Sequence, residues 1–247
     1  MKSSQQWVSY FKENLEIKRI DWQQPASITE NELKSILKSV QAWQLGETSD
    51  GKNLLKACSI YAERISDPYY IKAMQLFIKE EQKHGNNLGK YLDLIGQPRI
   101  KRNWGDTLFR IVRHLNNSME WWTITVIIIE SAAQIFYQSL KDATGCKLLK
   151  QICADILIDE AAHIQFQQER LATIFRSKTI IWRSLSYYWY KCFFLFVSLV
   201  VWAAHKKLFK AGGNSFKNYY PKIKYKSAKT IGKLKYEMDE KYAFQPS

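Results

Sequence analysis

Glycine, proline and paired cysteines are scarce in this chain of 247 residues. Ten Gly and five Pro are too few for the many tight turns of a β-sandwich. The four cysteines have no paired spacing, which excludes a zinc knuckle or a rubredoxin-type site and suits reduced thiols in the cytosol. They are Cys58, Cys146, Cys153 and Cys192. The start of the chain has no apolar stretch long enough for a secretory signal.

Nucleotide-binding and hydrolase signatures are also missing. The sequence contains no Gly-x-Gly-x-x-Gly, no Walker loop, no Gly-x-Ser-x-Gly and no low-complexity stretch. A hydrophobic content of 46% argues against disorder. The length is that of one domain with appendages.

Hydrophobic periodicity predicts an all-α protein. Apolar residues recur every three or four positions in five segments, as in amphipathic helices. The predicted helices span 29–66, 67–95, 106–115, 117 or 118 to 141, and 146–176. Thr29 is expected to cap the first with Glu32 as its capping-box partner, and Pro68 to stand at the start of the second. Residues 1–28 are predicted to be a short N-terminal helical extension.

Six polar side chains interrupt these apolar faces. A lone Glu stands on the first and third long helices, and a Glu-x-x-His pair stands on the second and fourth. The six residues are Glu47, Glu81, His84, Glu130, Glu160 and His163. The lone Glu precedes its pair by 34 residues in the first half (47 to 81) and by 30 in the second (130 to 160). Glu80, turned about 100° from Glu81 on a helix, is expected to face solvent.

This pattern indicates a metal site. Residues i and i+3 lie on one helical face, so each pair can direct a carboxylate and an imidazole at one point. Burying such groups without partners is costly, and bound cations offset that cost. Four carboxylates and two histidines suffice for two divalent cations in the core of a four-helix bundle. Taken alone, either pair could be a surface ion pair or a hydrogen-bonded core histidine.

The ordered set of six residues resembles the ferritin-like di-iron carboxylate superfamily, over residues 29–176. LGETSDG at 45–51 is similar to a segment of small bacterial ferritin-like proteins. The resemblance implies a ferritin-like four-helix bundle over 29–177, with the six residues as ligands of two iron ions. Mn/Fe or Mn/Mn pairs share the same hard ligands and stay open.

Departures from individual branches narrow the expected activity. Leu88 stands where ribonucleotide reductase small subunits carry a radical tyrosine, and the Cys-x-x-Cys module of rubrerythrins is missing. The resemblance then implies an oxidase or oxygenase that uses dioxygen and an electron donor on a small apolar substrate. Two alternatives stay open: iron oxidation or peroxide detoxification without an organic substrate, and a binding protein with a structural metal site.

The C-terminal third divides into a hydrophobic aromatic segment (178–209) and a Lys-rich tail (210–247). The uncharged run from Cys192 to Ala204 is shorter than the ~20 residues that span a bilayer. Three arrangements stay open for this segment: a fifth helix packed on the bundle or at a homodimer contact, an interfacial membrane helix, or a span.

The end of the chain carries much of its positive charge. From His205 onward there are eleven Lys against Glu237, Asp239 and Glu240, or +8 of a total of +14. Charge runs are usually solvated, and an anionic membrane surface reached through 180–247 is favoured over nucleic acid as a partner. We therefore expect a cytoplasmic protein, with peripheral attachment at the inner membrane face left open.

Overall fold

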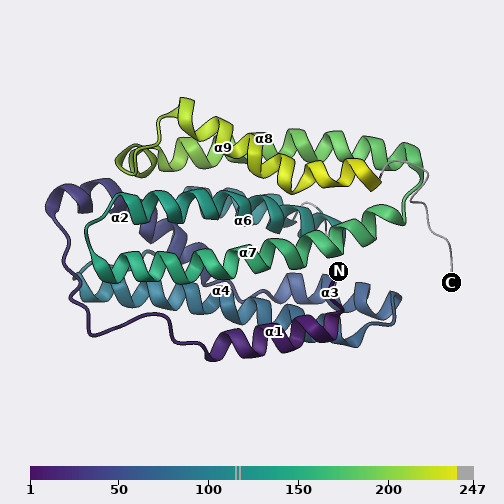
Figure 1. The fold of residues 1–247 in the computed structure, drawn as a ribbon, viewed down its shortest axis with the longest axis horizontal. Helices are drawn as coiled ribbons and strands as arrows, with labels where there is room; N and C mark the ends of the chain where they lie inside the picture. The colour runs from purple at the N-terminus through teal and green to yellow at the C-terminus, as the bar shows by residue number, and fades with distance from the viewer. Residues whose placement is uncertain (115, 117, 238–247) are drawn as a thin grey trace.

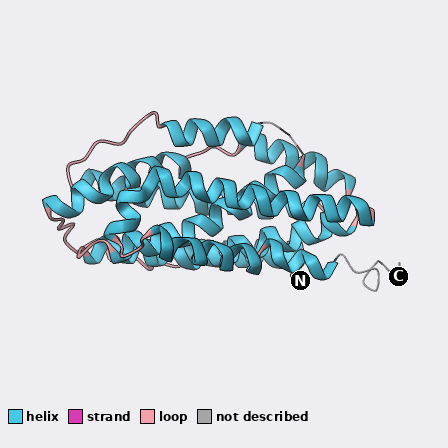
Figure 2. Cartoon of the chain, turned by 90° about the horizontal axis from the view of Figure 1, so that it is seen from above, coloured by secondary structure: helices cyan, strands magenta, loops and turns pink. Residues whose placement is uncertain are grey.

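The described part of the chain is entirely helical. The computed structural model describes residues 1–114, 116 and 118–237. Within them lie nine α-helices and one 3-10 helix, and Figure 2 shows helices and loops only. The helices are α1 (Ser4–Glu16), α2 (Glu30–Glu47), α3 (Lys52–Arg64), α4 (Pro68–Leu94), α5 (Trp104–His114), α6 (Met119–Asp142), α7 (Lys147–Arg176), α8 (Ile180–Ala211) and α9 (Phe216–Lys229), followed by the 3-10 helix η1 (Ile231–Glu237). The all-α prediction is confirmed.

The expected helix starts rest on local capping. Thr29 caps α2 in a capping box with Glu32, Asp67 caps α4 with Pro68 after it, and Ser118 caps α6. The predicted helix end at Leu115 and the alternative helix start at Asn117 lie outside the described residues.

The prediction of one continuous helix over 29–66 is wrong. The chain leaves the helix after Glu47 and resumes it at Lys52. Gly51 lies between them with φ +65°, and a Cβ there would come within 2.6 Å of Ile78 Cδ1. Only glycine combines that left-handed backbone with so close a contact. The glycine therefore marks a helix break, and there is no spare room beside it.

Four long helices form the bundle, and others cover it on two sides (Figure 1). α6 packs along α7, and α4 contacts both α2 and α7. On one side α1 packs on α4, and on the other α8 packs on α6 and α2 and carries α9. The burial of α6 explains its almost uniformly apolar sequence, since residues such as Ile124, Ile127 and Ile128 are fully enclosed.

The C-terminal third packs on the same core as the bundle. Leu208 and Phe209 of α8, Tyr219 and Ile223 of α9 and Leu234 of η1 belong to the main hydrophobic cluster. Of the three arrangements left open for residues 178–209, the structure shows the helix packed on the bundle. Among the described residues, α6 and α8 are long and apolar enough to cross a membrane, with 78% of that stretch buried in α6 and 28% in α8. Residues 238–247 of the Lys-rich tail lie outside the described residues.

Candidate metal centre

The structure brings all six predicted residues together between α2, α4, α6 and α7. They form two groups, and within each group one ligand-type atom per residue lies within 4.8 Å of every other. One group is Glu81, Glu130, Glu160 and His163, and the other is Glu47, His84 and Glu160. Because Glu160 belongs to both groups, its carboxylate would be available to a cation held by either group.

Helix geometry alone positions most of these side chains. Glu81 and His84 are one turn apart on α4, as are Glu160 and His163 on α7. Glu160 and both histidines are completely buried, whereas the Glu81 side chain is 19% exposed. Glu47 takes its place differently, because it is the last residue of α2 and precedes the break at Gly51.

Each histidine is oriented by a carboxylate from the opposite helix. His84 Nε2 lies 2.9 Å from Asp159 Oδ2, and His163 Nε2 lies 2.8 Å from Glu80 Oε2. Asp159 immediately precedes Glu160 on α7, and Glu80 immediately precedes Glu81 on α4. If each Nε2 carries the proton, both Nδ1 atoms are left as acceptors on the side of the carboxylate cluster.

The prediction that Glu80 faces solvent is wrong, since its side chain is fully buried. The predicted angle between the two side chains on α4 holds, because Glu80 lies one residue, or roughly 100°, from Glu81. That flank, however, is covered by α1, which packs along α4. The N-terminal extension thus turns an expected surface position into part of the site.

A polar layer contributed by α1 and the segment after it closes this flank. The Asn14 amide nitrogen donates to Glu80 Oε1 at 2.7 Å and to Asp159 Oδ1 at 2.8 Å. Arg19 Nη1 donates to Asp155 Oδ1 at 2.8 Å and to Asp159 Oδ1 at 3.2 Å, and Arg19 Nη2 donates to Asn14 Oδ1. Lys83 Nζ lies 2.8 Å from Asp159 Oδ2. Burial opposes ionisation of Asp159, but hydrogen bonds from His84, Asn14 and Lys83 keep its pKa below the ordinary value.

Replacing Asn14 by Leu should loosen the site without touching a predicted ligand. The change leaves two buried carboxylates short of a donor, which costs about 1–3 kcal/mol of folding free energy. Loss of such supporting contacts lowers metal affinity about 10- to 100-fold. Competition with a fluorescent chelator measures that affinity. Asn86→Leu, at an exposed position on α4, is the matched control, and equal affinities in the two variants would contradict the role given to α1.

A buried tyrosine holds the Glu47 side of the cluster. Tyr137 OH donates to Glu47 Oε1 at 2.9 Å. Burial and the nearby carboxylate of Glu81 raise the pKa of Glu47 well above its ordinary value, and burial together with Glu81 does the same for Glu130. Burial works to lower the pKa of His163, but Glu81 and Glu80 outweigh it and raise it. Without cations, Glu47 and Glu130 therefore bind protons more readily than ordinary carboxyl groups do.

Unsatisfied polar atoms show that the cluster fits bound cations. Both carboxylate oxygens of Glu160 and the Nδ1 of His84 are buried with no hydrogen-bond partner among the described residues. His163 Nδ1 lies 2.8 Å from Glu81 Oε1, but the two do not meet hydrogen-bond geometry. Buried atoms of this kind are normally paired. The Glu/His set is thus able to bind two metal ions, and its O and N donors suit Fe or Mn.

Comparison with solved structures identifies the architecture. R2-like ligand-binding oxidase without metal cofactor superposes with a TM-score of 0.68 at 17% identity, covering 96% of this chain and 97% of that one. A mutant of the same oxidase with anaerobically reconstituted Mn/Fe cofactor gives a TM-score of 0.67 at 17% identity, covering 96% and 94%. The chain has the ferritin-like fold. No protein-family model and no curated protein sequence matches it.

Several residues of this ferritin-like site were missed by the sequence prediction. Glu80, Asp159, Asn14 and Tyr137 all contact the six predicted residues or their partners. One signal was available, because an acidic residue stands directly before the Glu of both Glu-x-x-His pairs. No comparable pattern marks Asn14 or Tyr137, whose contacts span 66 and 90 residues of sequence.

Proposed function

We propose that this protein is a di-metal oxidase that uses dioxygen to oxidise an apolar organic substrate. One observation carries the proposal: a largely apolar pocket of about 260 Å³ is lined by the carboxylate-bearing residues Glu47, Glu81 and Glu130. The other acidic residues of its lining, Asp50 and Asp106, are paired with Lys52 and Arg110. A route for iron ions alone would instead favour carboxylates along its length. Ligand pockets of enzymes are typically apolar with a few polar groups at the reacting end.

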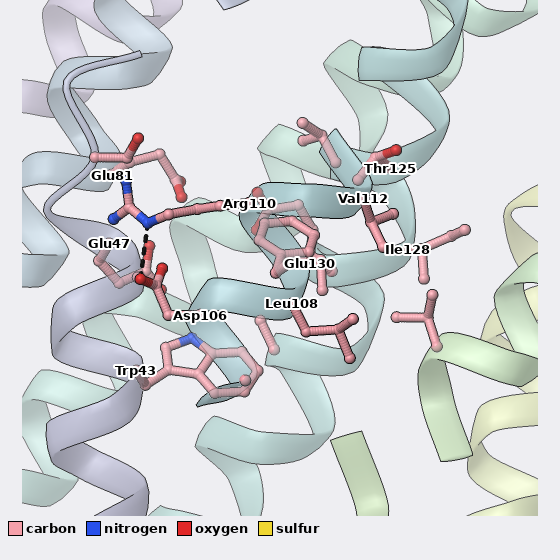
Figure 3. Close-up of a pocket in the computed structure, with 18 of the residues that line it drawn as sticks. Trp43, Glu47, Glu81, Asp106, Leu108, Arg110, Val112, Thr125, Ile128 and Glu130 are labelled. Atoms are coloured by element: carbon pink, nitrogen blue, oxygen red, sulfur yellow. Dashed lines mark hydrogen bonds and ion pairs between the residues drawn. The ribbon is translucent and has the colours of Figure 1, made fainter. Parts of the chain in front are cut away.

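The pocket is built by helices from both halves of the chain. α6 contributes Ile128 and Ile129, and α8 contributes Phe193 and Val197. Figure 3 shows the three carboxylates and the side chains of Leu108, Val112 and Ile128 around this pocket. An apolar substrate held there would displace water from the neighbourhood of the carboxylates.

The six predicted residues are the proposed ligands, with Glu160 shared between two metals. When bound, a pair of reduced Fe or Mn ions would supply the electrons that dioxygen accepts, and an external electron donor would restore them. The chain's own residues hold the site in order. Glu80 and Asp159 fix the two imidazoles, Tyr137 donates a hydrogen bond that orients the Glu47 carboxylate, and the apolar wall excludes water.

Metal analysis and oxygen uptake test this proposal together. Protein purified without added metal should carry about two Fe or Mn per chain. After reduction it should consume dioxygen, and a long-chain hydrocarbon or fatty acid added as probe should change the rate or be recovered oxidised. Oxygen uptake that depends on added Fe²⁺ and ignores every apolar compound would replace the proposal by iron oxidation. A metal content near zero would overturn it.

We further propose peripheral attachment to anionic membranes through residues 180–247. One face of α8 packs on the bundle, and its other face is an exposed apolar stripe. This α8 stripe comprises Ile181, Leu185, Tyr188, Cys192, Phe196, Leu199 and Ala203. Lys206, Lys207 and Lys210 follow it and are also exposed. Aromatic and aliphatic residues next to a lysine cluster suit the boundary between headgroups and acyl chains.

Sedimentation with anionic vesicles should show two separable contributions. Binding is expected to weaken by several-fold as salt rises, because lysine attraction is screened within about 8 Å at physiological salt. It should not vanish, because burial of the α8 stripe is largely indifferent to salt. Leu199→Glu should abolish the salt-resistant part, whereas Ile60→Glu on α3, an equally apolar exposed position, should not. A protein that ignores vesicles and instead forms homodimers would show that α8 serves a subunit contact.

A further inference from the structure

A second exposed apolar stripe lies on α5. It is separated from the α8 stripe by the pocket mouth, the exposed part of the lining between Leu108 and Phe196. Trp104, Leu108 and Ile111 are 59%, 38% and 57% exposed. They stand at i, i+4 and i+7, so they share one face of the helix. Three large apolar residues in this arrangement are costly to leave in water. Neither the metal cluster nor the packing of the bundle explains them.

The α5 and α8 stripes border the same pocket. Leu108 belongs to the α5 stripe and lines the pocket, and Phe196 does both on α8. Trp121 of α6 ties the two helices together. Its indole nitrogen donates to the carbonyl of Val112 at 3.0 Å, and its ring stacks on Phe193 with 5.2 Å between centroids. The two exposed apolar surfaces are therefore joined around one opening.

Charge decides what can cover this surface. Residues 170–236 contain no Asp or Glu, and Lys101 and Arg102 just before α5 are exposed. Two acidic residues of the pocket lining at this surface are paired: Asp106 of α5 with Arg110 at 2.7 Å, and Asp50 with Lys52 at 3.1 Å. A second copy of the chain would bring like charges together, whereas an anionic lipid surface complements them. A lipid bilayer is therefore the occupant that fits both the apolar and the basic character.

We propose that the α5 and α8 stripes form one membrane-docking surface around the pocket mouth, so that the pocket takes an apolar, membrane-dissolved substrate directly from the lipid phase. This inference rests on the proposed oxidase function for the fate of the substrate, but the docking geometry does not. A long apolar molecule partitions into the bilayer and is scarce in water. A mouth immersed in the acyl region would spare it the transfer through water.

Fluorescent labels on single cysteines test the docking geometry in the full-length protein. Cys192 is the exposed cysteine among the four, and it lies on the α8 stripe. A second variant carries Ile111→Cys on α5, and a control carries Ile17→Cys just after α1, on the side of the bundle away from α8 (Figure 1). The Ile111→Cys and Ile17→Cys variants both also carry Cys192→Ser, so that each has one exposed cysteine to label.

With vesicles of phosphatidylcholine and phosphatidylglycerol, the labels at 192 and 111 should shift to the blue. Acyl-brominated lipid should quench both, and the label at 17 should not respond. A response at 192 alone would overturn the proposal, because the mouth would then lie outside the membrane. A blue shift without vesicles that grows with protein concentration would identify a second copy as the occupant and overturn it as well.

Fluorine spectra test the substrate route independently of catalysis. Trp43 and Trp122 line the pocket, and their signals in 5-fluorotryptophan-labelled protein can be assigned by Trp→Phe changes. Anionic bicelles carrying a long-chain hydrocarbon should shift both signals, and empty bicelles should not. Trp104→Ser with Ile111→Ser should reduce this shift while metal content stays at two per chain. Unchanged shifts in that variant would show that the hydrocarbon enters elsewhere, and an unmoved pair of signals in the parent would overturn the route.

The metal and oxygen measurements are separate from these readouts. If the labels and fluorine signals respond as expected but no dioxygen is consumed, the docking surface stands and the oxidase function fails. If dioxygen is consumed and the labels do not respond, the reverse holds.

Discussion

Glu160→Ala is expected to remove tight binding of both metal ions, whereas Glu130→Ala should remove one. The Glu160 carboxylate is shared by the two groups of ligand-type atoms, whereas Glu130 belongs to one of them. A bridging carboxylate also screens the repulsion between two cations, so its loss affects the second ion as well as the first. Metal content after gel filtration should fall from about two per chain to well below one in Glu160→Ala.

The matched control is Glu63→Ala, which removes an exposed carboxylate from α3 and should leave two metals. Glu80→Ala should give an intermediate result, with weaker binding on the side of His163, because that imidazole loses its partner. Circular dichroism separates ligand loss from unfolding. Two metals retained in Glu160→Ala, with the helical content unchanged, would show that the carboxylate does not bridge.

Removing the two metals should lower the melting temperature at neutral pH by about 10–20 °C. A ligand present at 100-fold its Kd stabilises the folded state by about 2.7 kcal/mol per site. In a chain of this size each kcal/mol corresponds to about 2–4 °C. Thermal melts with and without chelator measure the difference. An unchanged midpoint would mean that the carboxylates do not share a cation.

The metal-free protein should also gain stability as the pH is lowered from neutral towards the ordinary carboxyl pKa of 4.5. In the folded chain the pKa values of Glu47 and Glu130 are raised above the ordinary 4.5, chiefly by burial. At pH values between the ordinary pKa and the raised pKa of these two carboxyl groups, the folded state binds more protons than the unfolded chain. Acidification in this range therefore favours folding. Glu81, whose pKa is lowered by His163 against the effect of burial, works in the opposite direction only near and below its ordinary value. The metal-loaded protein should lack this gain, because cations occupy the place of the protons.

Helical periodicity explains why the six residues could be predicted. Glu81 with His84, and Glu160 with His163, are set on one face by the 3.6-residue turn, whatever surrounds the helix. A lone Glu on an otherwise apolar α6 needs a partner in the core. Bound cations offset the energetic cost of burying four such carboxylates together. The bundle and the composition of its centre therefore follow from spacing and residue type.

The surroundings of those residues depend on packing between distant segments. Glu80 has the same helical phase in either environment. The docking of α1 on α4 covers it, and the packing of α4 against α7 brings it to His163. Tyr137 reaches Glu47 because α6 and the end of α2 meet there, next to the helix break at Gly51, whose backbone φ is +65°. Local sequence carries no record of such contacts, since each depends on shape and distance across the fold.

The C-terminal segment also shows which properties the sequence predicts and which depend on packing. Its apolar and basic composition was visible in the sequence, but composition is equally compatible with a packed helix, an interfacial helix and a span. Packing of Leu208, Phe209 and Tyr219 into the core fixes one face of the segment, and the remaining face borders the pocket. The sequence by itself determined which carboxylates and imidazoles share one face of α4 and of α7, because helical spacing is local. Tertiary structure decided what supports them and where the pocket opens, because burial is a property of the assembled helices.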